Sequence, residues 1–348
     1  MSFRTRIAEA LFVALAVAAA APALADAKLK DVTIVYPTPG STSWPIWFAK
    51  EGGYFEKYGL NVKVDLAMHP AGPAAVASGE ALTHNLGLDS AMLAAMKGDQ
   101  FVLVGSPLHK GQFVILANKT VPDVKALATM RIAVGRVGDP PYHYGLALLD
   151  YLKVPTKDIN WVSAGTPPQR ALAVKNGLAD AALLTPPDYY ALVDEGYKVV
   201  ADLADHPDVP VATTYMFQRK VLEQTPELVE AVLKAHVEAV KRFYDDKAFA
   251  LAVIQKYSKV PNPAYLSRLY DDTVKAKVLE RVPYVSARAI RAIIERGKAA
   301  SPELATFDFR KAIPEAPLDK LVDEGFFEKL YGPSIKAEVA AERAASFR

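Results

Sequence analysis

Hydroxyl and aromatic side chains gather directly after the first short apolar run of this sequence, VTIVY at 32–36. The segment that follows, TPGSTSWPIW at 38–47, carries three clustered hydroxyl residues and two tryptophans. Hydroxyls can hydrogen-bond a ligand or cap a helix, and indole rings offer large flat apolar faces. Ligands in open α/β sheets bind beyond the carboxyl ends of strands. We therefore predict ligand contacts here, with core packing as the alternative for the tryptophans, at Thr38, Ser41, Thr42, Trp44 and Trp47.

Polar and aromatic residues also follow later apolar runs, where further strands would end. The remaining candidate ligand contacts are Asp89, Ser90, His109, Gly138, Asp139, Tyr142, His143, Thr185 and Tyr189. Most have an ordinary structural alternative: the two aspartates as helix N-caps, His109 as a loop histidine, and the aromatic rings as packing residues. The loop GRVGDP at 135–140 disfavours small anions, because Asp139 would repel them and Pro140 and Pro141 lack amide donors.

The composition excludes several kinds of chemistry. The sequence has no cysteine, so it has no thiolate nucleophile, disulfide or cysteine-based metal site. Its six histidines show no metal-binding spacing, and no G-x-S-x-G motif is present. The net charge of +2 gives no basic field for nucleic acid. We expect a site that holds a small molecule, with no catalytic residue, metal or cofactor.

The N-terminus has the three parts of a secretory signal peptide. Arg4 and Arg6 precede the apolar run LFVALAVAAA, and Ala23-Leu24-Ala25 forms an A-x-A cleavage site. We predict cleavage of residues 1–25, with an N-terminal anchor helix as the alternative. No cysteine follows for lipidation, and no later apolar stretch reaches about 20 residues. The mature chain is therefore expected in the periplasm, without insertion into a membrane.

Residues 32–203 alternate short β-rich runs with helical patterns, which is typical of βαβ units. Nine strands are predicted, and the chain after about residue 218 is predicted to be mostly helical. Two blocks, 32–105 and 131–203, have similar layouts, which suggests an α/β fold of two lobes with a ligand cleft between them. The predicted divisions are 26–112 with 217–333 as lobe one, 113–216 as lobe two, and 334–348 as a C-terminal tail.

Four segments together resemble one known family. They are GGYFEKYGLNVKV (52–64), ALTHNLGLDSAMLAAMKGDQFVLVG (81–105), KALATMRIAVGRVGDPPYHYGLALL (125–149) and ALAVKNGLADAALLTPPDYYALVDEGYKVVADL (171–203). Their order and spacing resemble the periplasmic receptors of ABC importers for nitrate, alkanesulfonates, taurine and pyrimidine precursors. The resemblance implies a type II periplasmic-binding-protein fold, with crossover strands near 111–120 and 208–218 as the hinge. It also implies a monomer that delivers its solute to the permease subunits of an importer.

The nature of the ligand stays open at this point. The aromatic residues and the acceptors Asp89 and Asp139 favour a planar N-heterocyclic or aromatic compound with N–H donors. An aliphatic sulfonate, taurine or nitrate is the alternative that the resemblance implies. A pyrimidine-precursor-synthesising enzyme is a further alternative, although such relatives carry a cysteine-rich motif that this sequence lacks. A receptor that feeds a sensor in place of a permease is a third.

Overall fold

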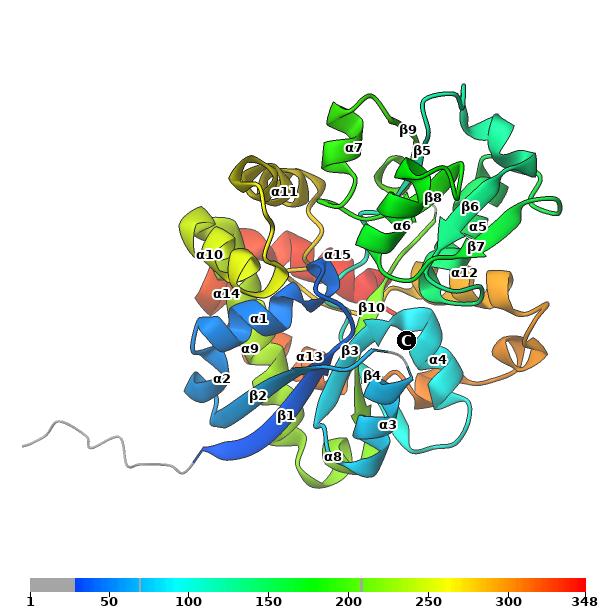
Figure 1. Cartoon of the computed structure of the whole chain (residues 1–348). Helices are drawn as coiled ribbons and strands as arrows, with labels where there is room; N and C mark the ends of the chain where they lie inside the picture. The colour runs from blue at the N-terminus through cyan, green and yellow to red at the C-terminus, as the bar shows by residue number, and fades with distance from the viewer. Residues whose placement is uncertain (1–28, 69, 207–208) are drawn as a thin grey trace, which may run out of the picture.

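The computed structural model describes residues 29–68, 70–206 and 209–348. The predicted signal peptide, residues 1–25, lies outside the described residues. Two five-stranded sheets, each covered by helices, form two α/β lobes, which confirms the predicted fold class (Figure 1). Nine of the ten strands correspond to runs that the sequence predicts.

Sheet one has the strand order β2-β1-β3-β10-β4. Its strands are β1 (Lys30–Tyr36), β2 (Leu60–Leu66), β3 (Thr83–Gly87), β4 (Phe101–Val104) and β10 (Thr213–Gln218). The first three run parallel, and β10 pairs antiparallel with both β3 and β4. The carboxyl ends of β1 and β3 therefore open at the same edge of the sheet.

Sheet two repeats this plan with the order β7-β6-β8-β5-β9. Its strands are β5 (Val114–Ala117), β6 (Arg131–Val134), β7 (Asn160–Ser163), β8 (Ala181–Leu184) and β9 (Lys198–Asp202). Here β5 is the antiparallel strand, between β8 and β9. The antiparallel strand of each sheet is thus the one that enters directly after the chain has crossed from the other lobe.

The chain crosses between the sheets at 105–113 and at 203–212. Sequence analysis assigned 213–216 to lobe two, but these residues pair with β3 and β4 in sheet one. We therefore propose 113–212 as lobe two. The predicted tail at 334–348 contains a helix, α15, which carries the buried residue Val339.

Helices make up most of the chain that follows β10. The helices are α1 (Trp44–Glu51), α2 (Tyr54–Lys57), α3 (Ala71–Ser78), α4 (Leu88–Ala95), α5 (Pro140–Tyr151), α6 (Pro167–Lys175), α7 (Tyr190–Asp194), α8 (Arg219–Gln224), α9 (Pro226–Asp245), α10 (Lys247–Ser258), α11 (Pro263–Ala276), α12 (Ala287–Gly297), α13 (Ala316–Asp323), α14 (Phe326–Tyr331) and α15 (Lys336–Ala345). Among the described residues, no helix combines the length and apolarity needed to cross a membrane.

Lobe one has a core on each face of sheet one. One core joins α1 to the long helix α9 through side chains such as Phe48 and Phe243, and the other joins α4 to α12 through Met92 and Ile290. The alternation of buried side chains along β3 and β10 distributes their residues between these two cores. Both cores hold the strand ends of lobe one in fixed positions at the junction with lobe two.

Candidate ligand-binding site

The loop after β1 forms the lobe-one side of the junction between the lobes. It leads into a short 3-10 helix, Ser41–Ser43, and from there directly into α1. The Thr38 and Thr42 hydroxyl oxygens lie 3.2 Å apart, and the Ser43 hydroxyl donates to the Thr38 carbonyl at 2.5 Å. Thr38 is exposed and Ser41 and Thr42 are partly exposed, so these three predicted contacts lie at the surface of this loop.

Trp44 and Trp47 occupy the core of lobe one. They are 1% and 0% exposed, respectively. Trp44 packs against Phe48 and Phe243, and Trp47 stacks on Tyr257 with ring centroids 4.7 Å apart. Their ring faces are therefore occupied by neighbouring side chains, which agrees with the packing alternative and not with a stacking surface for a ligand.

Buried polar atoms without partners lie near the end of β3. Asn85 donates its amide to the Thr42 carbonyl, but its Oδ1 has no hydrogen-bond partner within the described chain. The Thr213 hydroxyl also lacks one there. Thr213 pairs with Gly87, two residues beyond Asn85, so both side chains share one face of the sheet. Because an unsatisfied buried polar group is costly, this pair indicates a place built for a further polar partner.

The two lobes meet where α5 approaches the start of α4. Gly87 allows this approach, because a Cβ there would lie 3.0 Å from the Asp89 carboxylate and 3.3 Å from the Tyr144 hydroxyl. The hydroxyl is placed to donate a hydrogen bond to that carboxylate. Burial raises the pKa of Asp89, and Arg296 and His143 offset this only in part. Asp89 forms no ion pair with the residues that the structure describes.

A buried arginine organises the lobe-two side of the junction. Arg170 on α6 is 3% exposed and donates to the carbonyls of Leu183, at 2.7 Å, and Gly165, at 2.8 Å. Burial lowers the pKa of Arg170 to about 10, against the opposing charges of Asp188 and Asp139. These contacts join the ends of β7 and β8, and the Asp139 carboxylate at the end of β6 lies beside the same guanidinium.

Asp188 follows β8 and is partly buried. Burial raises the pKa of Asp188 to about 6, and the charge of Arg170 counteracts only part of this shift. The backbone N–H of Asp188 donates to the Thr185 carbonyl at 3.0 Å, which forms a turn directly after β8. Lobe two thus contributes a carboxylate that is poorly neutralised, as lobe one does with Asp89.

The other predicted site residues have varied surroundings. Tyr142 lies edge-on to Trp161, with centroids 4.9 Å apart, and His143 is exposed near Asp89. Asp139 is the N-cap of α5 without a side-chain capping bond, and its carboxylate accepts from Arg136 at 3.1 Å. Gly138 is exposed at a positive φ of 92°, and Ser90 is partly exposed beside Asp89.

His109 lies apart from this junction. Its Nε2 hydrogen-bonds the Tyr284 carbonyl at 2.7 Å, and its Nδ1 lies 3.6 Å from Glu280. Burial lowers the pKa of His109. The histidine therefore anchors the first crossover to the C-terminal region, and the structure gives no reason to retain it as a ligand contact.

A second contact between lobe two and the rest of the chain lies on the side of α7. Tyr190 is fully buried, and its hydroxyl donates to Asp272 on α11 at 2.8 Å. The guanidinium of Arg268 lies 4.1 Å from the Tyr190 ring centroid, and Tyr265 donates to Asp194 at 2.5 Å. Tyr189 packs edge-on against Tyr190, with burial raising the pKa of Tyr189 to about 12.

Sequence reasoning did not select Asn85, Tyr144, Arg170, Asp188 or Thr213. Asp188 was within the quoted segment TPPDYY and has the same signal as Asp89, a carboxylate just beyond a strand end. Tyr144 lies two residues after the predicted Tyr142, and helical geometry directs the two rings to different faces. Thr213 carries no local signal, because its position depends on pairing with Gly87, which is distant in sequence. Arg170 contacts residues close in sequence, but nothing in the segment PPQRALAVK indicates that its side chain is buried.

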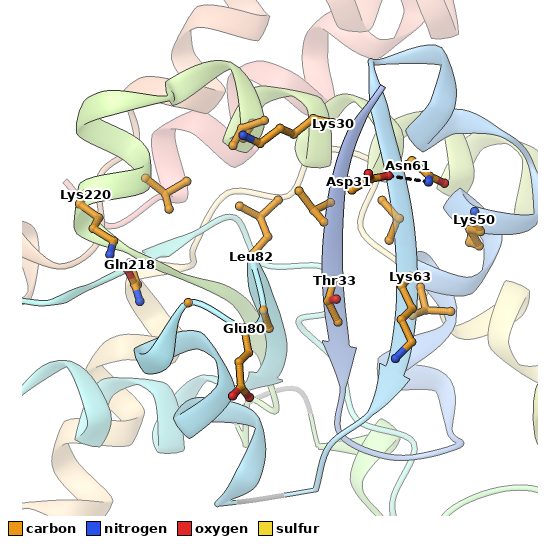
Figure 2. A pocket seen from close by; sticks show the side chains of 17 residues that line it. Lys30, Asp31, Thr33, Lys50, Asn61, Lys63, Glu80, Leu82, Gln218 and Lys220 are labelled. Atoms are coloured by element: carbon orange, nitrogen blue, oxygen red, sulfur yellow. Dashed lines mark hydrogen bonds between the residues drawn. The ribbon is translucent and has the colours of Figure 1, made fainter. Parts of the chain in front are cut away.

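A separate concavity of about 890 Å³ lies on lobe one, along the amino-terminal halves of β1 and β2 (Figure 2). Three of its charged side chains have side-chain partners: Lys50 pairs with Glu56 and Lys63 with Asp65 at 2.6 Å each, and Asp31 accepts from Asn61 at 2.7 Å. Because ligands of such sheets bind at the carboxyl ends of strands, we assign no ligand to this concavity.

Comparison with known proteins supports the fold. The NMT1-like family matches residues 25–257 of this chain. The structure is similar to a periplasmic sulfonate-binding protein SsuA from Methylobacillus flagellatus, with a TM-score of 0.68, 20% identity, and coverage of 86% of this chain and 96% of that one. It is also similar to the aliphatic sulphonate binding protein SsuA from Escherichia coli, with a TM-score of 0.65, 20% identity and coverage of 83% and 99%. No curated protein matches the sequence.

An enzyme shares this fold as well. The desulfurization enzyme DszB, in a complex with biphenyl-2-sulfinic acid, aligns with a TM-score of 0.64, 15% identity and coverage of 85% of this chain and 100% of that one. That structure carries a cysteine-to-serine mutation, and the present sequence has no cysteine. In the described part of the chain, no group of three or more acidic, histidine or cysteine side chains could hold a metal ion.

Proposed function

Because this chain belongs to the NMT1-like family and has the fold of periplasmic binding proteins, we propose that it captures a small solute between its two lobes. The solute then passes to the permease subunits of an ABC importer. The observation that carries this proposal is that polar groups gather at strand ends of both lobes: the unpartnered Asn85 Oδ1 and the carboxylate of Asp89 in lobe one, and the carboxylate of Asp188 in lobe two. The export of the chain after removal of residues 1–25 belongs to the same proposal.

The ligand that fits these groups is a small planar N-heterocycle with N–H donors. The Asn85 carbonyl oxygen lacks a donor within the described chain, and Asp89 and Asp188 are carboxylates whose pKa burial raises. A donor-bearing ring would supply the missing hydrogen bonds and relieve the cost of burying the carboxylates. Tyr142 and Tyr189 offer the partly exposed aromatic surface, in place of Trp44 and Trp47.

An aliphatic sulfonate, taurine or nitrate is the second candidate. Arg170 is the observation in its favour, since a guanidinium suits oxyanions and two similar structures are described as sulfonate-binding. However, both Nε and Nη1 of Arg170 already donate to backbone carbonyls, and Asp139 and Asp188 oppose its charge. The net field at the junction therefore favours a neutral or cationic ligand.

A ligand screen tests both candidates. The protein without residues 1–25 is titrated with an aminopyrimidine, ethanesulfonate and nitrate, and its melting temperature and binding heat are recorded. We expect binding of the aminopyrimidine alone. Tight binding of ethanesulfonate or nitrate would refute the N-heterocycle and keep the solute-binding role, whereas release of sulfite from biphenyl-2-sulfinate would contradict that role and favour an enzyme.

A further inference from the structure

A second cavity, which we call the hinge cavity, lies where the crossovers meet the C-terminal helices. Its volume is about 1050 Å³. Its lining includes residues 109–112 of the first crossover, Leu203 next to the second, the first turn of α12 and the last residues of the chain. None of these is among the strand-end residues of the proposed solute site, so any ligand of this cavity would be separate from the solute.

The charged side chains that line the hinge cavity are mostly cations. They are Lys110, Arg288, Arg291, Arg310, Arg348 and Glu342, which gives five cations against one carboxylate. The full chain has a formal charge of only +2, so this excess is local. Three of these cations have interactions of their own: Arg348 pairs with Asp319 at 2.8 Å, Arg310 lies 3.9 Å from Asp308, and Arg288 also has a partner. Lys110 donates to a neutral acceptor, the Ala276 carbonyl at 3.3 Å, so Lys110 and Arg291 are the cations on which a ligand site depends.

Glu342, the carboxylate of the lining, lies near two other acidic residues, Glu280 and Glu338. Burial raises the pKa of Glu342, which disfavours its charged form and so weakens the one opposing charge of the cavity. Between the cations the wall is apolar, with Leu203, Val278 and Phe347 among its side chains. An apolar surface with a few convergent charges is the usual character of a small-molecule site.

We propose that the hinge cavity binds an organic anion: a sulfonate, carboxylate or phosphate group on an apolar body. The acidic group contacts Lys110 and Arg291, and the apolar body lies on the wall between Leu203 and Phe347. This ligand is distinct in charge from the solute proposed for the junction of the lobes. The hinge cavity therefore favours an anion and the junction of the lobes a neutral or cationic ligand, so experiments can separate the two sites.

Anilinonaphthalene sulfonate is a suitable probe, because its fluorescence rises on binding and its neutral analogue phenylnaphthylamine lacks only the sulfonate. We expect the wild-type protein to bind the sulfonate at one site and more tightly than the amine. The double variant Lys110→Ala/Arg291→Ala should weaken sulfonate binding roughly tenfold, since charge-assisted contacts are lost. Lys298→Ala is the matched control, because Lys298 is the C-cap residue of the same helix α12 but does not line the cavity.

Three results would overturn the proposal: no sulfonate binding by the wild-type protein, equal affinity for the neutral analogue, or equal weakening in Lys298→Ala. A further variant, Asp89→Asn, separates the two sites. It removes a negative charge at the junction, so a probe bound there would gain affinity. An affinity that responds to Asp89→Asn and not to the double variant would move the anion to the junction of the lobes and refute the hinge cavity as its site.

Discussion

Two tyrosines of lobe two, Tyr144 and Tyr190, reach carboxylates in the rest of the chain. They come from α5 and α7, which lie toward opposite sides of lobe two (Figure 1). Tyr144 faces Asp89 on α4, and Tyr190 donates to Asp272 on α11 at 2.8 Å. Both rings are buried, at 4% and 0% exposure, so the pairs begin from the same chemistry.

The surroundings of the two carboxylates differ. Arg268 lies 3.6 Å from Asp272 and also covers the Tyr190 ring, so hydrogen bond, charge and packing are all satisfied within the chain. Asp89 has the Tyr144 hydroxyl but no ion pair among the described residues, and burial raises the pKa of Asp89. A completed network stabilises a structure, whereas an incomplete one leaves an interaction for a ligand.

The largest expected effect is the loss of the Tyr190 ring. Tyr190→Ala removes a fully buried side chain that joins α7 to α11, and large-to-small changes of aromatic core residues cost about 3–5 kcal/mol. Urea unfolding followed by circular dichroism measures this loss. Leu172→Ala, at a position on α6 that is 55% exposed, is the control and should cost about 1 kcal/mol or less. Equal losses in the two variants would remove the structural role of this contact.

The second prediction concerns ligand binding by Asp89. Asp89→Asn should weaken binding of an aminopyrimidine tenfold or more, since a hydrogen bond to a charged group contributes about 1.5–3 kcal/mol. The melting temperature without ligand should stay the same or rise, because the raised pKa of Asp89 means that its ionised form costs folding energy at neutral pH. Asp272→Asn should show the reverse pattern: lower stability and unchanged affinity. A parallel loss of both properties in Asp89→Asn would make Asp89 structural.

Local signals in the sequence were sufficient for most of the elements and for part of the proposed site. Alternation of β-rich and helical runs predicted nine of the strands, and the rule for strand ends selected Asp89 and Thr185. The same rule placed the tryptophans at the strand end but could not tell which way they point. Trp44 and Trp47 face inward because α9 and α10 supply aromatic partners such as Phe243 and Tyr257, which lie about two hundred residues later.

The remaining site residues depend on contacts that no local pattern encodes. Arg170 looks like an ordinary solvated residue of the segment PPQRALAVK, yet it is buried between the ends of β7 and β8. Thr213 is positioned by its pairing with Gly87, which is distant in sequence. The hinge cavity likewise combines the first crossover with the last residues of the chain. Such sites follow from topology, and topology was available only through the resemblance to a family.

The third prediction concerns pH and Asp188. Its pKa in the folded protein is raised from 3.8 to about 6, so the fold prefers the protonated form. The cost is absent below about pH 4, grows as pH rises from 4 to 6, and is fully present above 6; a two-unit shift corresponds to at most about 3 kcal/mol. Asp188→Asn should therefore stabilise the protein at pH 7.5 but not at pH 4, as measured by urea unfolding at both values. A gain of equal size at both pH values would contradict the shift.

The smallest expected effect is the loss of a single tyrosine hydroxyl, and it distinguishes the roles of Tyr144 and Tyr190. Tyr190→Phe and Tyr144→Phe each delete one hydrogen bond and keep the ring, so each should cost about 0.5–1.5 kcal/mol of stability. The variants differ in binding: Tyr144→Phe removes the hydroxyl that donates to Asp89 and should change aminopyrimidine affinity, whereas Tyr190→Phe should not. A double-mutant cycle of Tyr190→Phe with Asp272→Asn measures the coupling directly and should give roughly 0.5 kcal/mol or more. Tyr190→Phe could instead alter affinity as much as Tyr144→Phe does. In that case the contact between α7 and α11 also takes part in closing the lobes around the solute. The division between a structural pair and a ligand-binding pair would then be wrong.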